Sequence, residues 1–90
     1  MGFSGEMAPL SFIRYNGDGT KDFWVPERSG DYATDAAAGK RYGREFGEYI
    51  RETRNPVIYK SICRAMFDGG VWGPVEIGFC TEIGIFLAGM

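Results

Sequence analysis

Apolar and polar residues alternate over residues 10–25, apart from one polar interruption. In an extended chain one face would hold Leu10, Phe12 and Arg14, and the other would hold Ser11, Ile13 and Tyr15. The interruption, Asn16-Gly17-Asp18-Gly19, consists of residue types that tolerate positive φ angles and favour tight turns. This pattern predicts a β-hairpin over residues 10–25, preceded by a loose lead-in over residues 1–9 and ended by Pro26.

Residues 32–53 follow a different period, in which apolar or small residues recur every three or four positions. That spacing predicts one long amphipathic helix. Asp31 or Ser29 can cap its N-terminus, and Asp35 adds negative charge near the positive end of the helix. The residues of its apolar stripe are Ala36, Gly39, Gly43, Phe46, Gly47 and Ile50.

A second helix is predicted over residues 56–67, with Asn55 as its cap. Gly69-Gly70 ends it, because glycine adopts a left-handed conformation without a Cβ penalty. The stretch 75–87 fits two periods, since its odd positions alternate like a strand while other positions repeat like a buried helix. We favour the helix, because Pro74 suits a first helical position and Glu76 suits a first turn.

These elements predict an α+β fold: a hairpin followed by two or three helices in a single domain spanning residues 1–90, with the helical part over residues 31–90. The composition agrees with one folded domain, because 44% of residues are apolar, 24% are charged and the net charge is −2. The longest apolar run, near the C-terminus, is too short to span a bilayer, so we expect no membrane partner.

Three glycines, Gly39, Gly43 and Gly47, form an edge along the long helix. Each costs about 0.5–1 kcal/mol relative to alanine, so a compensating close contact is expected. The favoured interpretation is that the last helix, or an aromatic side chain such as Trp24, packs on this edge. The alternative is that a partner helix or a second copy of the chain occupies it, giving a homodimer.

The residue types argue against catalysis. The chain contains no histidine, which removes the commonest general base and metal ligand. Cys63 and Cys80 do not form a metal-binding pair motif and are expected to be reduced, buried thiols. Residues 16–27 resemble a calcium loop in part, but Lys21 occupies the position that requires glycine. We therefore expect no cofactor, no metal and no enzymatic activity.

Charge is segregated along the chain. Residues 1–35 hold three basic and six acidic groups, residues 36–67 hold seven basic and three acidic groups, and residues 68–90 hold three acidic groups alone. On the long helix, Arg41–Glu45 and Arg44–Glu48 are spaced for ion pairs of about 0.2–0.5 kcal/mol each. The candidate partner-binding residues are Asp18, Asp22, Trp24, Glu27, Asp31 and Asp35. The alternative is a basic face that contacts nucleic acid directly, formed by Arg41, Arg44, Arg51, Arg54, Lys60 and Arg64.

The run Gly73-Pro74-Val75-Glu76-Ile77-Gly78-Phe79 resembles stretches in small proteins of phages and plasmids, and the whole chain is similar in size and character to phage-encoded anti-CRISPR inhibitors. That resemblance implies a cytoplasmic, cofactor-free protein that blocks a nucleic-acid-handling host complex by contact. The expected partner is then a protein or ribonucleoprotein complex. A small regulatory protein that binds nucleic acid, or a self-associating structural subunit, are the alternatives.

Overall fold

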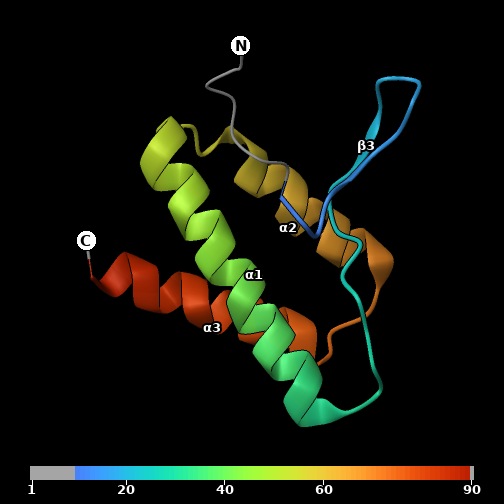
Figure 1. Ribbon diagram of the computed structural model, residues 1–90, viewed down its shortest axis with the longest axis vertical. Helices are drawn as coiled ribbons and strands as arrows, with labels where there is room; N and C mark the ends of the chain where they lie inside the picture. The colour runs from blue at the N-terminus through green and yellow to red at the C-terminus, as the bar shows by residue number, and fades with distance from the viewer. Residues whose placement is uncertain (1–9, 90) are drawn as a thin grey trace.

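Helices dominate the computed structural model, which describes residues 10–89 (Figure 1). The predicted lead-in over residues 1–9 lies outside the described residues. A short antiparallel pair, β2 (Arg14–Tyr15) and β3 (Lys21–Asp22), comes first. The helices α1 (Tyr32–Thr53), α2 (Val57–Gly69) and α3 (Pro74–Ala88) follow. The order of elements confirms the predicted α+β fold.

The hairpin is much shorter than the prediction over residues 10–25. Arg14 pairs with Asp22 and Tyr15 with Lys21, around a turn in which Gly19 has a φ of +92°. Before β2 the chain turns, with the Ile13 amide donating to the Leu10 carbonyl at 3.1 Å, and Phe12 and Ile13 are both buried. The chain therefore leaves the ladder there, because burying both side chains among the helices stabilises more than extending a two-stranded ribbon.

The predicted bounds of the long helix, residues 32–53, are those of α1. The Asp31 carboxylate accepts a hydrogen bond from the Thr34 amide at 2.9 Å, so Asp31 rather than Ser29 is the cap. At the other end Arg54 has a φ of 55°, and its amide donates to the Ile50 carbonyl at 2.8 Å. α1 is thus bounded by a side-chain cap and a left-handed residue.

The other two helices begin where their capping signals lie. α2 starts one residue later than predicted, and the Asn55 side chain accepts a hydrogen bond from the Val57 amide at 3.1 Å. It runs on to Gly69 and ends at Gly70, which has a φ of +71°. Residues 75–87 are helical within α3, as favoured over the strand. Among residues 10–89 no helix is long and apolar enough to cross a membrane.

The glycine edge of α1 is filled by α3, as the favoured interpretation predicts. A Cβ on Gly39 would lie 2.0 Å from the Val75 carbonyl oxygen, and one on Gly43 would lie 2.6 Å from Cβ of Glu82. The approach is mutual, because a Cβ on Gly78 of α3 would lie 2.4 Å from the Ala36 carbonyl oxygen. Figure 1 shows the two helices crossing at this point. A second copy of the chain therefore finds this edge already occupied.

Phe12 joins the N-terminal part of the molecule to the helices. Its ring centroid lies 5.3 Å from that of Trp24, 5.4 Å from that of Tyr42 and 5.5 Å from that of Phe79. α2 completes this core with Ile62 and Met66. The buried hydrophobic residues are Leu10, Phe12, Ile13, Ala38, Tyr42, Phe46, Ile62, Met66, Val75, Phe79 and Ile83.

Candidate binding site

The acidic partner-binding candidates do not form one surface. Asp18 lies in the exposed hairpin turn, where its carboxylate accepts from the Thr20 amide and hydroxyl, and Asp22 forms an ion pair with Arg14 at 2.6 Å. Asp31 caps α1. Figure 1 places the hairpin turn and the first turn of α1 at opposite ends of the molecule. Of the set, Asp18, Glu27 and Asp31 are exposed acids with no ion pair among the described residues.

Two members of the same set pack inward, Asp35 completely and Trp24 in part. Asp35 is buried and accepts hydrogen bonds from Ser29 and Gly30, which hold the pKa of its carboxyl below the usual range. The Trp24 ring packs 5.0 Å from that of Phe79. Asp35 is therefore engaged within the chain, whereas Trp24 leaves part of its ring exposed in a surface hollow.

The basic candidates are also divided. The ion pairs expected within α1 do not form among these described side chains. Instead Glu45 accepts from the Ser11 amide at 2.6 Å, and Arg44 faces Glu82 of α3 at 3.7 Å. On α2, Arg64 lies 3.7 Å from Asp68, while Lys60 is exposed. Arg41 lies over the Tyr42 ring, near the middle of α1.

A buried carboxylate, which the sequence analysis took for an ordinary first-turn residue, fastens the N-terminal segment to α3. Glu76 has an exposed fraction of 0% and accepts from Trp24 Nε1 at 2.7 Å, from the Gly73 amide at 3.0 Å and from both Nη atoms of Arg28. Burial alone would raise its pKa, but these hydrogen bonds outweigh burial and lower the pKa to about 2. With both oxygens engaged, Glu76 is a structural anion.

Cys63 and Cys80 are free, half-buried thiols. Burial raises the pKa of the Cys80 thiol, and the neighbouring Cys63 and Glu76 raise it further. A raised pKa disfavours the thiolate, so Cys80 is a poor nucleophile. Among residues 10–89 no group of three or more potential metal ligands comes together, and in the partial calcium motif Asp18 and Asp22 are engaged by Thr20 and Arg14.

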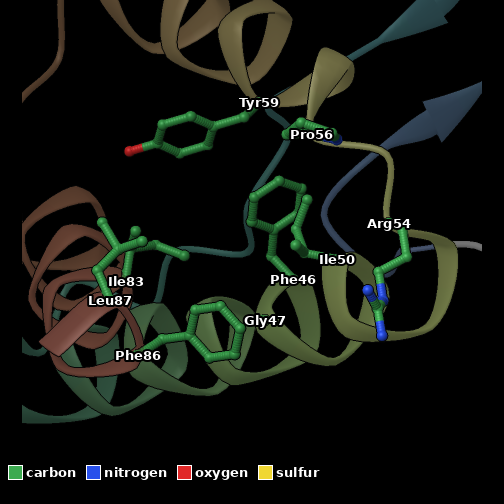
Figure 2. A pocket seen from close by; sticks show the side chains of 9 residues that line it. All are labelled: Phe46, Gly47, Ile50, Arg54, Pro56, Tyr59, Ile83, Phe86 and Leu87. Atoms are coloured by element: carbon green, nitrogen blue, oxygen red, sulfur yellow. The ribbon is translucent and has the colours of Figure 1, made fainter. Parts of the chain in front are cut away.

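An apolar pocket lies where the C-terminal halves of α1 and α3 diverge from their crossing point. Its volume is about 520 Å³. Figure 2 shows side chains of α3 facing those of α1 across the pocket, with Tyr59 and Pro56 of the α2 region closing another side. Its lining residues are Phe46, Gly47, Ile50, Arg54, Pro56, Tyr59, Ile83, Phe86 and Leu87. Such a hollow is of the size and character that holds apolar groups.

A second hollow of about 560 Å³ adjoins the first and shares Ile50, Arg54 and Phe86 with it. We call the two hollows together the apolar groove. Its charged side chains are Arg54 and Arg51, whose guanidinium carbon lies 5.3 Å from the centroid of the Phe86 ring. Among residues 10–89 neither arginine forms an ion pair. In the sequence both arginines belong to a broader basic face, and no local pattern there indicates the apolar walls beside them.

A further exposed apolar surface lies at the end of α2 and in the connector after it. Phe67 is 85% exposed and Trp72 is 62% exposed, with Val71 also exposed between them. The sequence marked Trp72 as a tryptophan near a turn, but its spacing did not distinguish it from Trp24. The difference is tertiary, because Trp24 has Phe12, Tyr42 and Phe79 around it.

No family model, curated protein or solved structure matches this chain in comparisons with known proteins.

Proposed function

We propose that this protein is a non-enzymatic binding module that holds a partner protein in the apolar groove. The composition of α3 carries the proposal. One face of α3 buries Val75, Phe79 and Ile83, while its C-terminal half leaves Ile85 and Leu87 each 59% exposed. A helix that is apolar on every side is normally covered on every side, so the exposed side chains beside the groove are best explained by a partner that covers them.

The chemistry of the groove favours binding over catalysis. Its walls are aliphatic and aromatic, and its charged groups are guanidiniums, which do not exchange protons near neutral pH. Tyr59 is the other titratable side chain of the lining, and burial, together with the neighbouring cysteines, raises its pKa to about 12. A phenol with that pKa stays protonated at neutral pH and makes a poor general base.

In its most specific form the proposal keeps the inhibitor hypothesis drawn from the sequence. The partner is then a nucleic-acid-handling host complex, and the protein acts by covering part of it. Asp18 and Glu27 remain exposed and can face a basic channel, where complementary charge speeds association. The apolar groove supplies the desolvated contacts that hold such a complex together.

A site-specific photocrosslinking experiment tests this proposal. The full chain is produced in bacteria with a photoreactive amino acid at Leu87, beside the groove, or at Ala37, an exposed position in the N-terminal half of α1. We expect one discrete partner to crosslink from position 87 and much less of it from position 37. Identifying that partner shows whether it handles nucleic acid.

The matched variant is Ile85→Ser combined with Leu87→Ser, which removes apolar contact area without touching the buried face of α3. It should retain the circular dichroism spectrum of the parent and lose at least tenfold of the affinity for the crosslinked partner, a difference of about 1.4 kcal/mol. Unchanged affinity in this variant, or equal crosslinking from both positions, means that the groove is not the binding surface.

A further inference from the structure

The shape of the apolar groove limits what can fill it. Two hollows of about 520 Å³ and 560 Å³ share Ile50, Arg54 and Phe86. On α3 the first also takes Ile83 and Leu87 and the second takes Ile85 and Gly89, which lie on opposite sides of that helix, so the hollows lie on the two sides of Phe86. An occupant that fills both must span Phe86 and carry an apolar group on each side of it. A single small ring or a short acyl chain fills at most one of them.

The charge of the groove limits the occupant further. Arg54 lines both hollows, and Arg51 lines the second while its guanidinium lies over the Phe86 ring. Neither arginine forms an ion pair among residues 10–89. Carboxylates next to the apolar groups of an occupant would form charge-assisted, bidentate hydrogen bonds with these guanidiniums. Ammonium groups at the same positions would be repelled.

The backbone at Arg54 sets the point at which its side chain leaves the helix. Its φ of 55° lies in a region that residues other than glycine rarely adopt, and its amide is fixed by the hydrogen bond to Ile50. The left-handed residue ends α1, so the Arg54 side chain departs where the helix stops and the groove opens. Figure 2 shows Arg54 at the side of the first hollow, beside Ile50.

We infer that the apolar groove binds an amphipathic α-helix of the partner, with two large apolar side chains in the two hollows and a carboxylate against Arg51 and Arg54. The inference rests on the proposed function and names its partner's chemistry. The walls are helices that diverge from a crossing, and a third helix can pack into such a wedge with its side chains between theirs. The strands β2 and β3 lie away from the C-terminal end of α3 (Figure 1), so strand addition is not available there.

Synthetic helical peptides test the inference directly. The probe is a fluorescein-labelled peptide of about 16 residues, long enough to form a helix, with leucines on one face and glutamates beside them. One matched peptide carries lysine in place of each glutamate, and another carries serine in place of each leucine. Fluorescence anisotropy with the full chain should show the glutamate peptide binding at least tenfold more tightly than either control.

Variants of the protein then assign the preference to the two arginines. Arg51→Glu should reverse it, so that the lysine peptide binds more tightly than the glutamate peptide. Arg54→Asn removes the second charge with a residue that tolerates the left-handed conformation, and it should weaken the glutamate peptide several-fold. Lys60→Gln, a charge removal on the exposed side of α2, serves as the control and should change neither affinity.

Three results would overturn the inference. Equal binding of the glutamate and lysine peptides would exclude recognition by the arginines, even if a partner still crosslinks from position 87. Self-association in sedimentation that is abolished by Leu87→Ser would show that a second copy fills the groove. Binding of decanoate that displaces no peptide and is lost in Arg54→Asn would identify a small-molecule site instead.

Discussion

At the residue scale, Glu76 shows how far a side chain's role depends on its surroundings. In the sequence it is an acid near the start of a helix, where negative charge is favourable. In the fold it is fully buried between Arg28, Trp24 and Gly73. A buried carboxylate is tolerated when both of its oxygens are engaged. Removing one partner of such an ion pair is costly, because the other partner is left as an unpaired charge.

The lowered pKa of Glu76 predicts a loss of stability in acid. The carboxyl has a pKa of about 2 in the folded chain and an ordinary value of 4.5. Its stabilising contribution is therefore complete above pH 4.5 and declines as the pH falls towards 2. The shift corresponds to a free energy on the order of 3 kcal/mol. Urea unfolding followed by circular dichroism across this pH range measures the decline.

The variant Glu76→Gln distinguishes the contribution of Glu76 to the acid dependence of stability from that of the other acidic residues. At pH 7 we expect it to lower the free energy of unfolding by about 3 kcal/mol, and to remove a large part of the acid dependence. Asp31 and Asp35, whose pKa values are also lowered, keep some of that dependence. Glu48→Gln, at an exposed position, is the control. An identical pH dependence in Glu76→Gln and the parent would contradict the assignment.

At the scale of elements, the crossing of α1 and α3 sets the position of the apolar groove. Backbone touches backbone where Gly39 faces Val75 and where Gly78 faces Ala36. Beyond that point the two helices separate towards their C-terminal ends (Figure 1). The groove is the space that this divergence opens. Bulkier residues at the crossing would push α1 and α3 apart and so move both walls of the groove. The small residues at the crossing therefore affect the shape of the groove, although most of them do not line it.

Two glycines of α3 give a matched pair that tests this crossing. Gly78→Ala places a methyl group 2.4 Å from the Ala36 carbonyl oxygen, so the helices must shift, and we expect a loss of about 1–3 kcal/mol. Gly84→Ala meets nothing within 4 Å and should gain about 0.5–1 kcal/mol from the higher helix propensity of alanine. Thermal unfolding followed by circular dichroism should show opposite shifts in Tm. Shifts of the same sign would contradict the close approach.

At the scale of the whole molecule, the segment before α1 and the helices share one core. Phe12 contacts Trp24 from the same segment, Tyr42 from α1 and Phe79 from α3. Glu76 adds a polar tie between α3 and Arg28. Since neither part retains a complete core without the other, the described chain should unfold as one cooperative unit.

Trp24 fluorescence tests this cooperativity in a Trp72→Phe background, because Trp72 is largely exposed and Trp24 is half-buried against the core. Urea transitions measured by Trp24 fluorescence and by helical circular dichroism should coincide. Phe12→Ala should lower the free energy of unfolding by about 3–5 kcal/mol by both measurements. Phe67→Ala, at a largely exposed position, should change it by less than about 0.5 kcal/mol. An earlier fluorescence transition would mean that the N-terminal segment detaches first.

The sequence by itself determined the order of elements and most helix boundaries, because those signals are local. Asp31 caps α1, glycines end α2 and Pro74 opens α3, and each acts on backbone within a few residues of itself. The spacing of Gly39, Gly43 and Gly47 also predicted a close helix contact, since glycines at that interval remove side chains from one helical edge.

The tertiary structure alone decided which side chains are buried, and with them the candidate site. Phe12 lies outside the short strands and packs among the helices. Trp24 packs against the core while Trp72 is exposed, and the Glu76 carboxylate accepts a hydrogen bond from Arg28. The groove depends on the angle at which α1 and α3 cross. Each of these outcomes depends on contacts between segments far apart in the chain, whereas periodicity and capping report on neighbours along it.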